Sequence, residues 1–152
     1  MTDTRGEGIM NALFSHYGPF KGELPGRKNG VLVAMETAEA VGFALMNLED
    51  RGVIFIHPQT KCYEGMIIGE HSRENDLVVN IAKGKKLSNM RASGSDEATR
   101  LTPPREHTLE QALEYIADDE LVEVTPHFIR MRKRILDANE RKKVEKKISE
   151  SY

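Results

Sequence analysis

Lysine, arginine and small polar residues gather in one stretch of the chain, residues 83–98 (KGKKLSNMRASGSDEA). Its first half carries cations and no acid, and no apolar periodicity runs through it, which predicts a long connecting loop. The cations there are Lys83, Lys85, Lys86 and Arg91, and they lie beside glycine and small hydroxyl residues. Cationic side chains bind phosphates, and glycine lets a backbone come close to them. The stretch therefore fits contact with a polyanion, and the alternative is a solvated loop whose lysines only keep the protein soluble.

A second group of cations lies near the C-terminus, at Arg130, Arg132, Lys133 and Arg134. Strand alternation would place Arg130 and Arg132 on one face, where they could meet neighbouring phosphates. The alternative is a solvated face that balances an acidic helix expected at residues 109–117. The formal net charge is only -2, so a nucleic-acid partner would have to be recognised through this uneven distribution of charge.

Other chemistries lack the residues that they need. No G-x-x-x-x-G-K-[ST] motif is present to hold a nucleoside triphosphate. The histidines are dispersed and Cys62 is the only cysteine, so neither a metal cluster nor an intrachain disulfide is expected. Ser93 and Ser95 lie near Asp96 but outside a G-x-S-x-G turn. We therefore expect no catalytic residue and no bound metal in this chain.

The localisation expected from the sequence is cytoplasmic. No apolar run is long enough to span a bilayer, and the first residues do not follow the pattern of a signal peptide. A single cysteine also suits a reducing compartment.

Strand patterns dominate the first two-thirds of the chain. β-Branched and alternating apolar residues predict strands at residues 31–35, 53–56, 63–71, 77–81, 121–125 and 127–132. A short strand at 40–42 and a helical turn at 44–51 are expected between the first two, with Gly52 after the turn as its C′ residue. Residues 9–17 fit either a strand or a helix.

Two helices have clear start signals. Thr108 with Gln111 forms a capping-box pattern before an apolar face, and Asp137 with Glu140 can cap a helix over residues 138–148. The expected fold is α+β: a mostly antiparallel β-sheet or a partly open barrel, with two to three helices, one basic long loop and a helical basic C-terminal tail.

Several strings in the chain carry a resemblance to a known family. Residues 4–8 (TRGEG) and 14–17 (FSHY) resemble the last strand of the fifth domain of elongation-factor-G-like GTPases. The rest of the chain up to Asp137 is similar to the C-terminal domain peculiar to BipA/TypA ribosome-associated GTPases. The matching strings are NGVLVAMET (29–37), FALMNLEDRG (43–52), YEGMIIGEHSRENDLVVN (63–80), KGKKLSNMRASGSDEA (83–98), LTPP (101–104) and TLEQALEYIADDELVEVTP (108–126).

The resemblance implies a ribosome-binding piece of a larger translational GTPase. Residues 1–18 would be a remnant of the fifth domain, and residues 19–152 the C-terminal domain. The loop at 83–98 would reach the peptidyl-transferase region of the large ribosomal subunit, and contact ribosomal RNA and the tRNA acceptor end. By this resemblance the residues expected to contact RNA are Lys83, Lys85, Lys86, Asn89, Arg91 and Ser93. The family is linked to large-subunit assembly and to growth under stress and cold. GTP and Mg²⁺ would belong to the GTPase domain outside this chain, which itself would need no cofactor, and neither a membrane nor DNA is an expected partner.

A second class of function stays open. The acidic helix at residues 109–117 could dock a basic ribosomal protein, in which case the cations of residues 83–91 would be inert.

Overall fold

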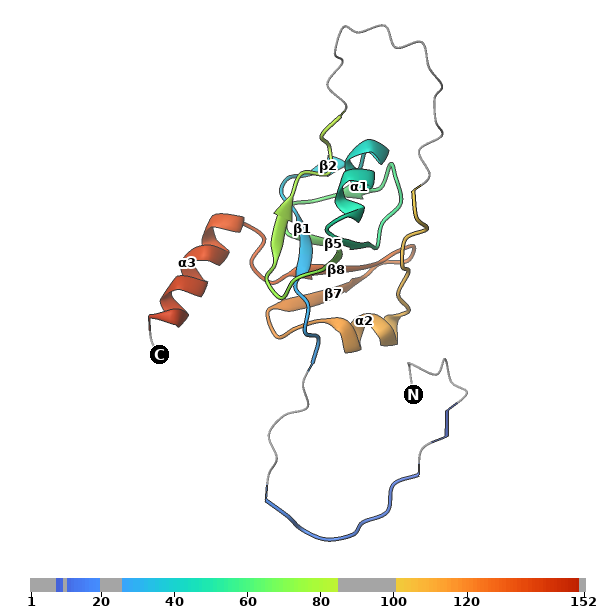
Figure 1. Cartoon of the computed structure of the whole chain (residues 1–152), viewed down its shortest axis with the longest axis vertical. Helices are drawn as coiled ribbons and strands as arrows, with labels where there is room; N and C mark the ends of the chain where they lie inside the picture. Colours follow the sequence, from blue (N-terminus) through green and yellow to red (C-terminus); the bar gives the residue numbers. More distant parts are fainter. Residues whose placement is uncertain (1–7, 10, 20–25, 85–100, 151–152) are drawn as a thin grey trace, which may run out of the picture.

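The computed structural model describes residues 8, 9, 11–19, 26–84 and 101–150 of the 152-residue chain. Groups of consecutive strands are separated by single helices along the described part, as shown in Figure 1. The strands are β1 (Val31–Ala34), β2 (Ala38–Glu39), β3 (Gly52–Ile54), β4 (Lys61–Cys62), β5 (Met66–His71), β6 (Leu77–Val79), β7 (Glu120–Val124) and β8 (Ile129–Lys133). The helices are α1 (Gly42–Glu49), α2 (Leu109–Tyr115) and α3 (Ala138–Ser149).

The main sheet has the order β6-β1-β5-β8-β7, and β3 also pairs with β5. β1 runs antiparallel to β5 along one edge, while β3 and β8 share the other edge of β5. The β1–β6 pair is parallel, and the other pairs of this sheet are antiparallel. β2 and β4 form a separate two-stranded ribbon. The prediction of an α+β fold with a mostly antiparallel sheet is confirmed, and the sheet is open and not closed into a barrel.

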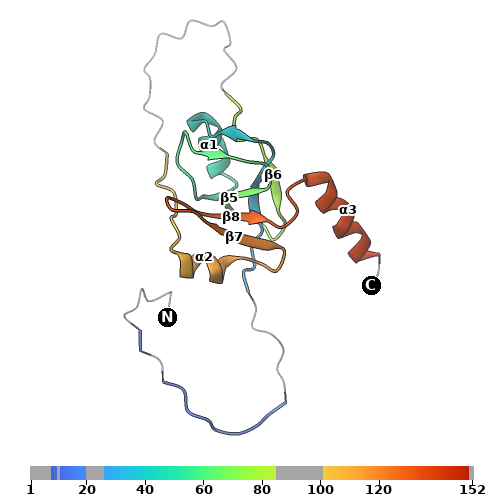
Figure 2. The ribbon, with the colours of Figure 1, turned by 180° about the vertical axis from the view of Figure 1, so that it is seen from behind.

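Helices cover both faces of the central strands (Figure 2). On one face, Leu32 and Ile68 pack with Leu45 of α1 in a core that also contains Ile81. On the other face, alternate residues of the same strands pack against Ala112 of α2. Because both faces are covered, β1 is buried at every position and reads in the sequence as an uninterrupted apolar run.

The predicted caps are present in the structure. The Thr108 hydroxyl accepts a hydrogen bond from the Gln111 amide at 3.3 Å, and the Gln111 side chain accepts one from the Thr108 amide at 3.0 Å. The Asp137 carboxylate accepts from the Glu140 amide at 2.7 Å at the start of α3. These bonds satisfy amides that a helix N-terminus leaves without partners, and they set where α2 and α3 begin.

Three local predictions were wrong. Residues 40–42 do not form a strand, since β2 ends at Glu39 and α1 begins at Gly42. Residues 11–17 belong to neither a strand nor a helix, and Leu13 and Tyr17 are each 94% exposed. Gly52 lies in β3, paired with β5, and not in a helix cap. The position needs a glycine because a Cβ there would come within 1.8 Å of the Glu70 carbonyl oxygen on the neighbouring strand.

β5 begins at Met66, three residues later than the predicted strand. Gly65 has φ +83°, a conformation that side chains disfavour, and an added Cβ would lie 2.8 Å from Leu136. The chain therefore turns at Gly65, where the backbone accepts the Lys133 amide at 2.9 Å and fixes the end of β8 beside it.

No helix among the described residues has the length and apolar character needed to cross a membrane.

Candidate nucleic-acid interface

Of the basic segment at 83–98, the structure describes only Lys83 and Gly84. Lys83 is exposed and makes no ion pair with the described residues. The other candidates of this segment lie outside the described residues: Lys85, Lys86, Asn89, Arg91 and Ser93.

The described residues that flank the segment on each side are fixed beside α1. On the incoming side, Ile81 is fully buried and its carbonyl accepts the Val41 amide at 2.9 Å, just before α1 begins. On the outgoing side, Leu101 packs on the same core and the Thr102 amide donates to the Glu49 carboxylate of α1 at 2.7 Å. The fold therefore presents the cationic segment from one defined place on the body, by which we mean the sheet with α1 and α2.

The four C-terminal candidates are divided between the two faces of β8. Arg130 and Arg132 are half-buried on one face, and Arg134 beyond the strand is exposed. The Arg130 guanidinium lies 3.4 Å from the Glu123 carboxylate and 4.8 Å above the Phe128 ring. Arg132 donates to the Lys133 carbonyl at 3.3 Å and makes no ion pair with the described residues.

Lys133 points to the opposite, buried face, and only 2% of the residue is exposed. Its ammonium group lies between three carboxylates, at 2.5 Å from Asp76, 2.8 Å from Asp119 and 2.9 Å from Glu120. Burial by itself lowers the pKa of Lys133, but hydrogen bonds to these carboxylates outweigh it and leave the pKa raised. Since its charge is neutralised inside the protein, Lys133 has no phosphate-binding capacity on this surface.

Glu120 is the centre of the same buried network, and no local pattern in the sequence indicated this role. Its two carboxylate oxygens each accept a hydrogen bond at 2.8 Å from Arg27, a bidentate pair, and one of them also accepts the Ala117 amide at 3.0 Å. We call the set Arg27, Asp76, Asp119, Glu120 and Lys133 the Glu120 network. It joins the chain before β1 to the turns before β6 and β7 and to the end of β8.

A groove of about 650 Å³ lies beside α2. Phe55, Ala112, Ile129 and Met131 lie among the residues that line it, together with several polar side chains. Its cations are already paired: Arg105 lies 3.0 Å from Glu70, and Arg130 is held by Glu123. This groove therefore does not extend the basic surface.

No alternative chemistry emerges within the part of the chain that the structure describes. It contains no group of three or more His, Cys, Asp or Glu residues placed to hold a metal ion. Cys62 is buried, and burial raises the pKa of its thiol to about 11, so the reactive thiolate is disfavoured.

Known proteins are similar to this chain along nearly its full length. The sequence profile of the TypA/BipA C-terminal domain family matches residues 29–138. Curated relatives named "Large ribosomal subunit assembly factor BipA" include those of Haemophilus influenzae (55% identity over 144 residues), Escherichia coli K12 (56% over 144) and Bacillus subtilis 168 (50% over 145).

The alignments cover 94–95% of this chain but only 23–24% of each relative, so the chain spans about a quarter of the length of these proteins. The family match includes every strand of the main sheet as well as α1 and α2. The chain belongs to the TypA/BipA C-terminal domain family.

Proposed function

We propose that this chain binds RNA of the large ribosomal subunit, and the tRNA acceptor end beside it, through the cations of residues 83–91. The observation that carries the proposal is the way the residues that flank this segment are held. Buried Ile81 and the Thr102–Glu49 hydrogen bond fix the flanking residues beside α1, and Lys83 is exposed without an ion pair to the described carboxylates. The relatives' name, a large ribosomal subunit assembly factor, supports the choice of partner.

The binding would be chiefly electrostatic. Lys83, Lys85, Lys86 and Arg91 would neutralise phosphates, while Asn89 and Ser93 would donate hydrogen bonds to phosphate or sugar oxygens. Arg132 and Arg134 are further candidates because they keep exposed surface and no internal ion pair among the described residues. Arg130 would first have to leave Glu123, and Lys133 is left out because the Glu120 network holds it.

For the longer protein we propose a cytoplasmic translational GTPase that acts in large-subunit assembly and in adaptation to stress or cold. GTP and Mg²⁺ would be bound by a domain outside these residues. Residues 1–18 would complete the fifth domain, and residues 19–152 would serve binding and carry no catalytic group.

The double variant Lys85→Ala/Lys86→Ala tests the RNA contact. If three or four cations meet phosphates, the logarithm of the affinity for purified large subunits should fall against the logarithm of salt concentration with a slope of about -2 to -4. The variant should flatten this slope by about 1.5 and weaken binding about tenfold or more at 0.1 M salt. Sedimentation with large subunits at several salt concentrations measures both quantities.

The matched control is Lys28→Ala/Lys61→Ala, which removes the same charge from exposed positions that make no ion pair with the described residues. Equal affinity of the loop variant and this control would contradict the proposal.

A protein-docking function is the second candidate, and one observation favours it. Leu109 and Leu113 of α2 are 37% and 56% exposed, so part of the apolar face of the helix remains uncovered beside Glu110 and Glu114. Exposed apolar residues with acidic neighbours suit a basic protein surface.

Charge reversal by Glu110→Lys/Glu114→Lys separates the two functions. If RNA contact dominates, binding to large subunits should stay within about twofold or strengthen slightly, since added positive charge attracts RNA. A loss of more than about tenfold would instead identify α2 as the docking element.

A further inference from the structure

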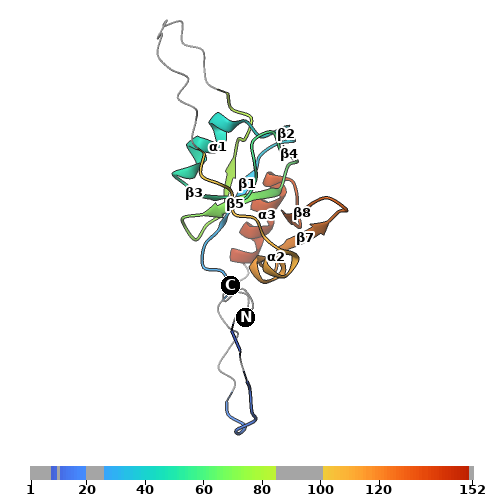
Figure 3. The same ribbon diagram turned by 90° about the vertical axis from the view of Figure 1, so that its right-hand side faces the viewer.

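The helix α3 stands apart from the body of the domain. Figures 1 and 2 show it beside the sheet and not upon it, and in the view of Figure 3 it overlaps the strands because it lies on the far side of the body. No residue of α3, which the structure describes throughout, is buried. The family match ends at residue 138, the first residue of this helix. Neither packing on the core nor the family match therefore accounts for the positive charge of this helix.

Local interactions hold α3 in a defined direction. Arg141 in its first turn donates to the carbonyl of Ile135 at 2.8 Å and also to that of Leu136, in the connection from β8. The Ala138 amide donates to the Glu64 carboxylate at 3.4 Å. Together with the Asp137 cap, these bonds tie the first turn to the body, so the rest of the helix projects from a fixed base.

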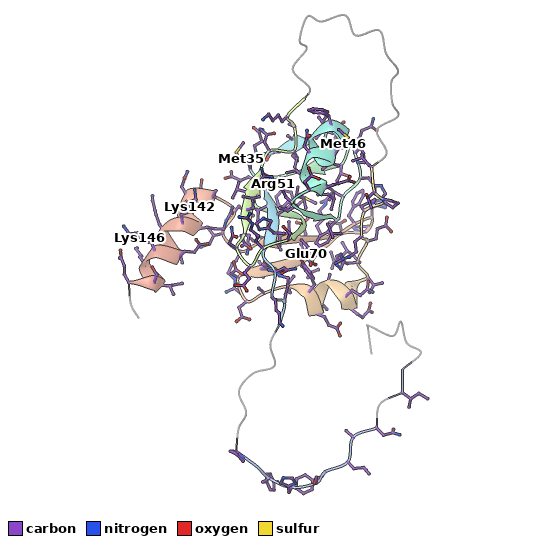
Figure 4. All side chains as sticks on the ribbon, viewed as in Figure 1. Met35, Met46, Arg51, Glu70, Lys142 and Lys146 are labelled. Carbon is purple, nitrogen blue, oxygen red and sulfur yellow. The ribbon has the colours of Figure 1, made fainter. Side chains whose placement is uncertain are left out.

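The exposed face of α3 carries four lysines in two adjacent rows. Lys142 and Lys146 lie one turn apart, as do Lys143 and Lys147. Figure 4 shows Lys142 and Lys146 on the side of α3 turned away from the body. Glu145 instead lies toward the body, where it lines a polar hollow together with Asp76 and Lys133.

The protein's own acids neutralise little of the charge on three of these lysines. Among the described residues, no carboxylate comes within salt-bridge distance of Lys142 or Lys143, and Lys146 meets only Glu150, at 3.7 Å in an exposed pair. An exposed pair of this kind contributes little free energy and yields readily to a stronger anion.

We propose that this lysine face, formed by Lys142, Lys143, Lys146 and Lys147, is a second phosphate-binding surface for the same structured RNA. The inference rests on the function proposed above. Ammonium groups at this spacing can meet successive phosphates without reading bases, so the surface would position the domain and would not select a sequence. A membrane is a poorer fit, because Val144 and Ile148 are the only large apolar residues of the helix.

The topology lets the lysine face act together with the basic segment. β6 runs parallel to β1, and β8 also runs parallel to β1 because each is antiparallel to β5. The residues that follow β6 lead to Lys83, whereas those that follow β8 lead to α3, whose Glu145 lies beside Asn29 and Asp76, before β1 and β6. The two basic elements therefore leave the body on different sides and can meet separate phosphates of one RNA (Figure 1). Two weak binding surfaces linked through one rigid body raise each other's effective concentration, and the pair binds more tightly than either alone.

The test replaces the four lysines by glutamine, Lys142→Gln/Lys143→Gln/Lys146→Gln/Lys147→Gln, in the full 152-residue chain. Glutamine keeps a good helix propensity, and circular dichroism would verify that helix content is retained. Binding to purified large subunits and to protein-free large-subunit ribosomal RNA is measured across salt concentrations. Because the variant can no longer neutralise at least two phosphates, the slope should flatten by about 1.5, and affinity at 0.1 M salt should fall by about tenfold or more.

The control removes equal charge from exposed positions on other parts of the chain, Lys28→Gln/Arg51→Gln/Lys61→Gln/Arg73→Gln. If the helix variant and the control behave alike while Lys85→Ala/Lys86→Ala still weakens binding, the inference about α3 fails and the proposed function stands. If the unmodified chain shows no salt-dependent binding, the proposed function itself fails. A loss seen with intact subunits but not with protein-free RNA would assign the lysine face to a ribosomal protein and overturn the RNA partner.

Discussion

Replacement of Glu120 by glutamine is expected to lower the free energy of unfolding by about 3 kcal/mol. The side chain of Glu120 is fully buried, and its charge offsets those of Arg27 and Lys133. The amide of glutamine would place N–H groups against other donors and would leave the Arg27 charge uncompensated. Removal of one partner from a buried ion pair costs about 3–5 kcal/mol, and the lower end applies here because Lys133 keeps Asp76 and Asp119.

Urea denaturation at pH 7 measures the loss, with Asp118→Asn as the control. Asp118 lies on the turn just before Glu120 and β7, is exposed, and loses the same charge on substitution. The control should change stability by less than about 0.5 kcal/mol. Similar stabilities for the two variants would show that the Glu120 network does not hold the fold.

The same variant predicts a pH dependence. Burial alone raises the pKa of Glu120, but hydrogen bonds from Arg27, the Ala117 amide and Lys133 outweigh it, and the pKa is lowered overall. A carboxyl whose folded pKa lies below its unfolded value stabilises the protein above the unfolded pKa, about 4.3 for glutamate, and loses that effect as pH falls through the folded pKa. The stability difference between the wild type and Glu120→Gln should thus be full at pH 7 and shrink on acidification below about pH 4.

Gly52→Ala is the second substitution with a large expected effect. The added methyl group would lie 1.8 Å from the Glu70 carbonyl oxygen and 2.9 Å from its carbonyl carbon, both backbone atoms of β5. β3 pairs with β5 through Gly52 and His71, so the methyl group can be accommodated only by separating the two strands. We expect a loss of about 3 kcal/mol, the upper end for overpacking, because backbone cannot rotate aside as a side chain can.

Gly84→Ala serves as the control for this substitution, since no atom of the described residues outside its chain neighbours lies within 4 Å of a Cβ at that position. Thermal unfolding followed by circular dichroism compares the two variants. The prediction fails if Gly52→Ala unfolds at the same temperature as the control.

Local signals in the sequence predicted the elements that local interactions determine. The caps at Thr108 and Asp137 act over three residues, so sequence alone places the starts of α2 and α3. α1 was harder to predict. It begins with a glycine, and apolar residues lie on most of its sides, so residues 40–48 show no clean helical period. The tertiary packing of Leu45 and Leu48 against the sheet decides its conformation.

The candidate site was predictable in part for the same reason. A run of cations is visible in any sequence, but which of them keep their charge available depends on distant acids. Strand alternation from buried Met131 places Lys133 on the buried face, and this was the one local signal that could have separated Lys133 from the other cations. Its partner Asp76 and the bidentate Arg27–Glu120 pair, 93 residues apart, come from folding and have no local signature.

The contacts of Arg27 extend the folded unit beyond the range of the family match. The family match begins at residue 29, yet the guanidinium that clasps Glu120 belongs to residue 27 and also stacks over Tyr115 at 4.7 Å. A polypeptide limited to residues 29–138 would therefore keep every strand of the main sheet but would lose the Arg27 side chain that pairs with Glu120. The smallest polypeptide that keeps this pair of side chains therefore has to begin at or before Arg27, upstream of the family match.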